Sequence, residues 1–566
     1  MLNELVDYDT WRKNNNPSLK ELEEQKAVVF KDAPLISIIV PVYNTKIDHL
    51  NEMFESVLNQ TYKHWEICLA DGASDNDEIR KVIENYAKDD NRVKYVFLDK
   101  NMGISKHTDT AIGLSCGSYL AFLDSDDILS PDAMFEVAKA IIENPDVDLI
   151  YSDTDFFHEE QNKLSGPMFK PAASPNFSTL LNYVIHLVVI KTETVKKLGM
   201  HDSNYDRVQD YDIAFKVFEI SDKIINIPKI LYTWRTHTSQ TNYMDDKSTE
   251  EKDIHNMLIL QCRKMHLRRM GMEDEYVEWY YGGQPPSNLF VFVSIIIPFY
   301  GNTDKLKSCI ESVTNNISKY DKEILVVNVN QLPDDDVFGT NEWKSMPYVR
   351  IIDMHRDFDK NNISKAINYG VGQAKGNYLL ILNSHTCILN PYTINEMVKY
   401  VQYPKTAAAG CKINYINNAS HIISTGGQEY IGCNFPMFKF YYRKSIPESK
   451  NITTGFVDSN HNGVYNVSSI TDAFCLIKKE IFDEVNGFNE DYPLSLYMVD
   501  FCLRLRKLGY YHIIHGFYAL NFNQRGHPLH IEAVKNFKQE QELFEKEYKD
   551  ELSKPDPYLN PNIILF

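Results

Sequence analysis

The sequence predicts an α/β protein made of two doubly wound domains in tandem, joined by a helical linker. First, its 566 residues are too many for a single hydrophobic core. Second, segments of the first half return in the same order in the second half, which indicates a duplicated domain. Third, each half alternates apolar β-branched runs with segments of helical periodicity, the pattern of parallel βαβ units.

The repeat is visible in three pairs of segments. SIIVPVYN (37–44) returns as SIIIPFYG (294–301), GSYLAFLDSDDILSP (117–131) as GNYLLILNSHTCILNP (376–391), and DYDIAFKV (210–217) as MVDFCLRL (498–505). The third pair is a loose match. Because the order is kept, we expect both halves to share one fold.

Within the first half, the strand that begins at residue 37 is followed by the helical pattern HLNEMFESVLNQ (49–60) and by a second strand, EICLAD (66–71). The polar turns VPVYN, LADGASD and LDSDD each come at the end of such a strand. Ligands of doubly wound sheets bind at the carboxyl ends of the strands. We therefore expect the three turns to border one crevice.

The segments outside the repeat set the predicted boundaries. The first residues are polar with a helical pattern, a long amphipathic helix at 248–272 precedes the breaker GGQPPSN, and another helix follows residue 530. We predict a helical arm at 1–34, a first α/β domain at 35–245, a linker at 246–288, a second domain at 289–530, and a helix with a tail at 531–566.

Composition narrows the class of protein. The formal charge of −19 argues against a nucleic-acid partner, which would need a basic face. No apolar run is long enough to span a bilayer, and the N-terminus lacks the order of a signal peptide. Nine cysteines in apolar surroundings without zinc spacing indicate reduced thiols. These features predict a cytoplasmic protein, with at most peripheral contact with the inner face of a membrane.

The acidic turn LDSDD places Asp124, Asp126 and Asp127 within four positions. One interpretation is a turn that caps the next helix, since Asp and Ser favour such turns. However, Ser130 and Pro131 already provide a helix start. The second interpretation is a site for Mg²⁺ or Mn²⁺, which would relieve the repulsion between the carboxylates.

In this order, SIIVPVYN, LADGASDN, NMGIS, GSYLAFLDSDD and QDYD resemble the family 2 glycosyltransferases of the GT-A fold. Downstream, LIYSDTD, MFKPAASPNFSTLLNYVIHLVVI and ILYTWRTHTSQT resemble bacterial enzymes that build O-antigens and other surface polysaccharides. Many of those enzymes carry two such domains. The resemblance implies an enzyme that uses Mn²⁺ or Mg²⁺ and a UDP-, dTDP- or GDP-sugar donor, with a saccharide, lipid-linked or protein acceptor.

Carried over by residue, the resemblance implies that Asp210 is the catalytic base and that Asp212 is structural. It also implies a metal held by Asp124 and Asp126 and reached by His237. The other interpretations remain open: Asp210 starts a helix and could serve its dipole, and His237 could be structural. The implied contacts with the nucleotide sugar are Pro41, Val42, Tyr43, Asn44, Asp71, Asp124, Ser125 and Asp126. A single displacement would invert the anomeric centre.

The second half departs from this pattern. His385 takes the place of the metal-binding carboxylate, Met498 takes the place of the base, and LVVNVN (325–330) lacks the acidic residue of the nucleotide turn. Methionine cannot accept a proton from a hydroxyl, and neutral imidazole is a poor ligand for Mg²⁺. We therefore predict that the second domain is not catalytic. The alternatives are a two-site polymerase that adds two sugars and a sugar-binding scaffold.

Overall fold

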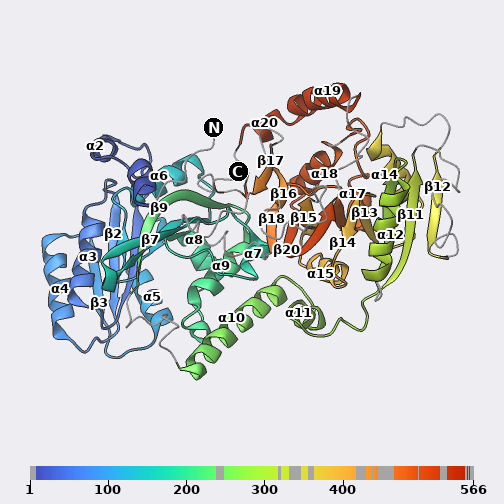
Figure 1. Cartoon of the computed structure of the whole chain (residues 1–566). Helices are drawn as coiled ribbons and strands as arrows, with labels where there is room; N and C mark the ends of the chain where they lie inside the picture. Colours follow the sequence, from blue (N-terminus) through green and yellow to red (C-terminus); the bar gives the residue numbers. More distant parts are fainter. Residues whose placement is uncertain are drawn as a thin grey trace. The chain divides into compact units, whose positions relative to one another are not determined.

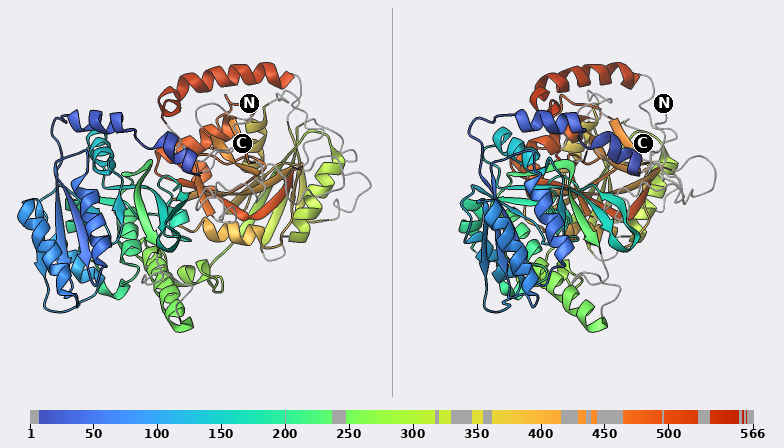
Figure 2. Two further views of the ribbon diagram at one scale, coloured as in Figure 1. Left: turned by 60° about the vertical axis from the view of Figure 1, so that its left-hand side comes forward. Right: turned by 90° about the vertical axis from the view of Figure 1, so that its left-hand side faces the viewer.

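The computed structural model of the chain forms two compact units (Figures 1 and 2). The described residues are 8–199, 201–236, 248–316, 320–329, 346–354, 362–415, 429–434, 439–443, 464–494, 496–522, 532–554, 557–558 and 560. The first unit contains the described residues up to Met270 together with Asn560, and the second begins at Gly271. Each unit has its own mixed sheet.

The first sheet has the order β3-β2-β1-β4-β8-β6-β9-β5, with β7 paired to β6. Strands β1 to β4 are parallel, whereas β8 runs antiparallel to both β4 and β6. The chain moves outward from β1 to β3 and returns to β4 on the other side of β1, so the topological switch point lies between β1 and β4. The strands are β1 (Ile36–Val42), β2 (Trp65–Asp71), β3 (Val93–Phe97), β4 (Tyr119–Phe122), β5 (Ile128–Leu129), β6 (Leu149–His158), β7 (Lys163–Met168), β8 (Val188–Lys191) and β9 (Ile224–Thr236).

Amphipathic helices cover this sheet. Helix α3 buries Leu50, Met53, Phe54 and Val57, which follow the 3.6-residue period, in the same core as the apolar side chains of β1 and β2. The helices of this unit are α1 (Tyr8–Asn15), α2 (Leu19–Ala27), α3 (Ile47–Leu58), α4 (Asp77–Asp89), α5 (Ile104–Ile112), α6 (Ala133–Glu143), α7 (Pro175–Ser178), α8 (Thr192–Leu198), α9 (Gln209–Ile220) and α10 (Thr249–Arg269).

Helix α10, which falls in the predicted linker, packs against α9 of the first unit. Phe215 stacks on His266 with ring centroids 4.1 Å apart, and the buried Cys262 lies in the same cluster as Tyr211. Arg263 also donates to the hydroxyl of Tyr211 at 3.0 Å. Helix α10 therefore supports the helix that carries the predicted base.

The second sheet repeats the first. Its order is β12-β11-β10-β13-β19-β15-β16-β17, and β20 pairs with β14, β15 and β18. As in the first unit, the first strand lies between the second and the fourth, and the next neighbour of the fourth is antiparallel. The strands are β10 (Phe292–Phe299), β11 (Asp321–Asn328), β12 (Val349–Asp353), β13 (Tyr378–Leu382), β14 (Thr386–Ile388), β15 (Thr406–Tyr415), β16 (Glu429–Asn434), β17 (Lys439–Arg443), β18 (Val464–Val467), β19 (Phe474–Lys478) and β20 (Tyr511–Phe522).

The helices of the second unit are α11 (Asp274–Tyr280), α12 (Thr303–Asn316), α14 (Ile363–Gly372), α15 (Thr393–Tyr400), α17 (Lys479–Glu484), α18 (Leu496–Lys507), α19 (Glu532–Glu547) and α20 (Lys549–Leu552). Among the residues described in the two units, no helix combines the length and the apolar character needed to cross a membrane.

Both units also share a buried polar cluster. A serine of the first strand donates to a glutamate of the second strand, at 2.6 Å in the first unit and 2.7 Å in the second. The amide of a glycine just before the fourth strand donates to the same serine, and the backbone leaves no room for a side chain at that glycine. The residues are Ser37, Glu66 and Gly117, and their counterparts Ser294, Glu323 and Gly376. This shared cluster supports a common origin of the two halves.

Candidate active site

The end of β1 and the end of β2 are joined by a network of side chains. Asn44 has a left-handed backbone, with φ of 52°, and exchanges two hydrogen bonds with Asp75, at 2.8 and 2.9 Å. The hydroxyl of Ser74 accepts from the Asn44 amide at 2.8 Å and donates to buried Asp71 at 2.5 Å. Because Val42 pairs directly with Asp71, the predicted nucleotide residues of the two strands are neighbours.

Pro41 and Tyr43 complete this edge. Pro41 pairs with Ala70 across the two parallel strands, and Tyr43 is 46% exposed. The ring of His107, on α5, lies 6.4 Å from the Tyr43 ring and directly against the backbone of Gly72. Burial lowers the pKa of His107, although the Asp71 carboxylate opposes this shift. Sequence reasoning did not single out His107.

The acidic turn lies at the end of β4, beside β1. Ser125 shares a hydrogen bond of 2.6 Å with Thr45, which ties the turn to the end of β1. The Asp124 side chain is 44% exposed. Partial removal from water, together with the charges of Asp126 and Asp210, raises the pKa of Asp124 to about 7. The structure therefore brings Asp124, Asp126 and Asp210 close enough for their charges to interact.

Asp127 is held differently from its two neighbours. It is buried, and it accepts hydrogen bonds from the Tyr232 hydroxyl at 2.6 Å and from the Arg235 amide at 2.7 Å. Arg235 also donates to the carbonyl of Asp126 at 2.8 Å. Asp127 therefore shapes the turn by binding it to β9.

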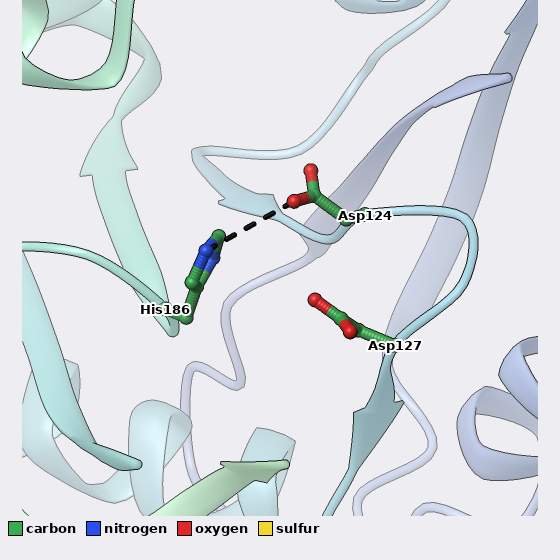
Figure 3. A group of neighbouring side chains, drawn as sticks. All are labelled: Asp124, Asp127 and His186. Atoms are coloured by element: carbon green, nitrogen blue, oxygen red, sulfur yellow. Dashed lines mark ion pairs between the residues drawn. The ribbon is translucent and has the colours of Figure 1, made fainter. Parts of the chain in front are cut away.

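His186 is a third side chain at the acidic turn, and it precedes β8. Its Nε2 lies 3.9 Å from Oδ2 of Asp124 (Figure 3). The ring stacks on Tyr232 at 4.7 Å and meets the edge of Trp234 at 4.6 Å. Burial and the nearby Lys170 ammonium lower the pKa of His186 to about 3, so the imidazole is neutral and able to act as a ligand.

Two sets of residues could hold a cation here. Asp124, Asp127 and His186 offer ligand atoms within 4.8 Å of one another. The set predicted from sequence was Asp124, Asp126 and His237, of which His237 lies outside the described residues. The structure thus adds His186 as a candidate ligand. In sequence it is only a single histidine before an apolar run, so its approach to the turn depends on the antiparallel placement of β8 beside β4.

The two carboxylates at the start of α9 have different surroundings. Asp212 is buried and pairs with Lys216 at 2.6 Å and with Arg269 of α10 at 3.1 Å. Asp210 instead accepts a hydrogen bond from the amide of Asn182 at 2.8 Å. Burial raises the pKa of Asp210. Asp212 is engaged in ion pairs within the fold, whereas the charge of Asp210 contributes, after burial and Asp126, to the raised pKa of Asp124.

The strand registers identify the counterparts in the second unit. Asn328 ends β11 as Asp71 ends β2, and it donates to Asp353 at 2.8 Å. The strand after the acidic turn pairs Cys387 with Asn521, as Ile128 pairs with Thr233. Asn521 is therefore the counterpart of Thr233. The counterpart of His237 comes later, outside the described residues.

Further substitutions surround the turn of the second unit. Lys191 and Lys478 pair with equivalent residues of the fourth strands in the two units. His186 and Ala473 lie the same number of residues before these lysines, so Ala473 takes the place of His186. Buried His385 occupies the position of Asp126, and its amide donates to Asn383 at 3.0 Å. At these described positions, the second unit therefore has other residues in place of Asp126 and His186 of the first unit.

Helix α18 repeats only the structural half of the α9 arrangement. Asp500 is buried and pairs with Arg504 at 2.8 Å, and it accepts from the Tyr548 hydroxyl at 2.6 Å. Met498, two residues earlier, is buried in the apolar core. Its neighbour Tyr497 is buried too and donates to Asp472 at 2.6 Å. The counterpart of Asp212 is thus retained as a carboxylate, and the counterpart of Asp210 is methionine.

Comparison with known proteins identifies the family. The model of "Glycosyl transferase family 2" matches residues 37–190 and 294–485, one region in each unit. An uncharacterized protein, y4gI, of Sinorhizobium fredii is 30% identical over 94% of this chain and 58% of its own length. The O-antigen biosynthesis protein RfbC of Myxococcus xanthus is 26% identical over 89% of this chain and 38% of its own length.

A chondroitin synthase of Escherichia coli is 28% identical over 45% of this chain and 36% of its own length. The chain thus spans between about a third and three fifths of the length of these relatives. Each matched region lies within one unit and covers most strands of its sheet, which confirms the predicted fold of tandem GT-A domains. The chain belongs to glycosyl transferase family 2 and carries two domains of that family.

Proposed function

We propose that the first unit transfers a sugar, with inversion, from a UDP-, dTDP- or GDP-sugar to a saccharide, lipid-linked or protein acceptor. The setting would be the synthesis of a surface polysaccharide or glycoconjugate. Relatives named for O-antigen biosynthesis and chondroitin synthesis support this setting. In this proposal the second unit does not catalyse sugar transfer and keeps only a binding or supporting role.

One observation carries the proposal. In the first unit Asp210 lies near enough to Asp124 for its charge to add to burial and to the charge of Asp126 in raising the pKa of Asp124, while Asp212 forms ion pairs with Lys216 and Arg269. A carboxylate beside the donor site can take the proton of the acceptor hydroxyl as the new bond forms. Burial raises the pKa of Asp210, which makes it a stronger base, and Asn182 orients it. An attack from the side opposite the leaving diphosphate would invert the anomeric centre.

The acidic turn fits a divalent cation. Asp124 is accessible and its ionisation is opposed by Asp126, so a cation there would relieve the repulsion. Mn²⁺ or Mg²⁺ held by Asp124 and Asp126, with His186 or His237 beside them, would neutralise charge on the departing nucleoside diphosphate. In this proposal Tyr43 and Asp71 would contact the nucleotide.

Two alternatives are weaker. A two-site polymerase needs a second base and a second metal site, and Met498, His385 and Ala473 provide neither. A sugar-binding scaffold would not need to retain Asp210 and Asp124 together in the first unit. The divergence of the second unit therefore supports a single catalytic site.

The experiment is a screen of nucleotide sugars for hydrolysis and transfer by the purified chain, with Mn²⁺, with Mg²⁺ and with EDTA. We expect release of nucleoside diphosphate from one class of donor, only with a metal present. The anomeric configuration of the product, read by NMR, should be opposite to that of the donor. Retention of configuration, or equal activity in EDTA, would refute the inverting metal-dependent mechanism.

A matched variant tests the assignment of the two units. His385→Ala changes the acidic turn of the second unit alone, so the rate of transfer should stay close to that of the unmodified chain. A loss comparable to that of Asp126→Ala, made in the first unit, would show that both units catalyse.

A further inference from the structure

Strand β6 carries two buried carboxylates near the candidate site. Asp153 and Asp155 are both buried, and the pairing of β6 with β9 shifts register on both sides of Asp153. A buried carboxylate needs hydrogen bonds or a countercharge. Asp155 accepts from the Tyr8 hydroxyl of α1 at 2.7 Å and lies 3.4 Å from Arg12. The partners of Asp153 come from a different part of the chain.

Lys170 is the charged neighbour of Asp153. Its amide donates to Oδ1 of Asp153 at 3.0 Å, and its side chain is buried. The ammonium donates to the carbonyl of His186 at 2.5 Å and also to the carbonyl of Ile185. It reaches the hydroxyl of Thr154 at 2.9 Å. Lys170 therefore holds the backbone that presents the His186 ring to the acidic turn.

Asn560 completes this group from the far end of the sequence, 407 residues after Asp153. It is buried in the first unit. Its amide donates to both carboxylate oxygens of Asp153, at 2.9 and 2.8 Å, and to the carbonyl of Lys170 at 2.9 Å. The Asn560 side chain thus binds both the carboxylate of Asp153 and the backbone of Lys170.

We propose that Asn560 is a positioning residue for the donor site. By fixing Asp153 and the backbone of Lys170, it keeps the Lys170 ammonium on the His186 carbonyl, and this keeps the imidazole facing Asp124. The inference rests on the proposed function, because it assumes that His186 and Asp124 meet a metal or diphosphate. Loss of a group that hydrogen-bonds directly to a metal ligand weakens metal affinity by about 10–100-fold. Asn560 acts one step further out, through Lys170, so we expect an effect near the lower end of this range.

A merely structural role makes a different prediction. If Asn560 only stabilised the fold, its removal would lower the unfolding temperature and leave the properties of the folded protein unchanged. If it positions His186, the folded variant should bind Mn²⁺ with UDP more weakly. Its kcat should approach that of the unmodified chain once Mn²⁺ is raised to saturation.

The test uses the full chain with Asn560→Ala and, as a second variant that keeps a small polar group, Asn560→Ser. Exposed Asn91→Ala serves as the matched control. Binding of UDP in the presence of Mn²⁺ is measured by calorimetry well below the unfolding temperature of each variant. We expect affinity to fall by about tenfold or more in Asn560→Ala, by less in Asn560→Ser, and not in the control.

The outcomes distinguish failure of the positioning role of Asn560 from failure of the proposed function. Unchanged binding of Mn²⁺ and UDP by either folded Asn560 variant would overturn the positioning role and leave the proposed function intact. Failure of the unmodified chain to bind Mn²⁺ with UDP would overturn both. If Asn560→Ala does not fold, the result for Asn560→Ser decides.

Discussion

Replacing Asp127 tests whether the carboxylates of the acidic turn have separate roles. The structure gives Asp127 two hydrogen bonds from buried donors, the Tyr232 hydroxyl and the Arg235 amide. Asp124, three residues earlier, is 44% exposed, and burial and the neighbouring carboxylates raise the pKa of both Asp124 and Asp127. We therefore expect Asp127→Ala to destabilise the first unit and Asp124→Ala to leave its stability unchanged or raised.

The magnitude follows from the two lost acceptors. A buried donor left without a partner costs about 1–3 kcal/mol, so two such donors give about 2–6 kcal/mol in Asp127→Ala. Relief of repulsion within the turn, and water that enters the space, would keep the net loss in the lower part of this range, at about 2–4 kcal/mol. Asp127→Asn retains an acceptor for the Arg235 amide and should lose about 1 kcal/mol.

Scanning calorimetry in EDTA measures these effects without a contribution from bound metal. The Asp127→Ala change should lower the midpoint of the first unit by about 5–10 °C, and Asp124→Ala should not. The reasoning fails if Asp127→Ala unfolds at the temperature of the unmodified chain. It also fails if Asp124→Ala is as destabilising as Asp127→Ala.

Two further predictions concern buried histidines. Burial lowers the pKa of His512 to about 4, and its Nε2 donates to the carbonyl of Cys502. The unfolded chain therefore binds a proton at pH values where folded His512 stays neutral, and this contribution lowers stability by up to about 1.4 kcal/mol per pH unit as pH drops from about 6.5 towards 4. In urea unfolding, His512→Gln should lose this contribution, while buried His515, whose pKa is lowered to about 3, keeps its own. Gly72→Ala would place a Cβ 2.1 Å from the His107 ring, so UDP binding should weaken, and His107→Ala in the same chain should partly restore it if the clash is the cause.

The repeat and the periodicity of the strands were sufficient to predict the fold class. Buried parallel strands have nearly continuous apolar sequences, so SIIVPVYN and SIIIPFYG could be recognised as strands without a structure. The buried pair of Ser37 and Glu66 could not, because a polar residue in a strand gives no sign of its partner across the sheet.

In the candidate site, too, local sequence patterns could be predicted and contacts between distant segments could not. The acidic turn and the two carboxylates of QDYD are local patterns, and the structure places Asp124, Asp126 and Asp210 near one another. His186 and Asn560 reach the site through contacts between distant segments, and no local pattern encodes such contacts. The roles of these residues remain predictions.

The most direct test of the account is the effect of Asp210→Asn on two quantities measured together. Binding of UDP with Mn²⁺ should be close to that of the unmodified chain, whereas the rate of sugar transfer should fall by about 10²–10⁴-fold, the usual contribution of a general base. Exposed Asp222→Asn, just beyond α9, should change neither quantity. Transfer by Asp210→Asn at the rate of the Asp222→Asn control would contradict a single catalytic site in the first unit.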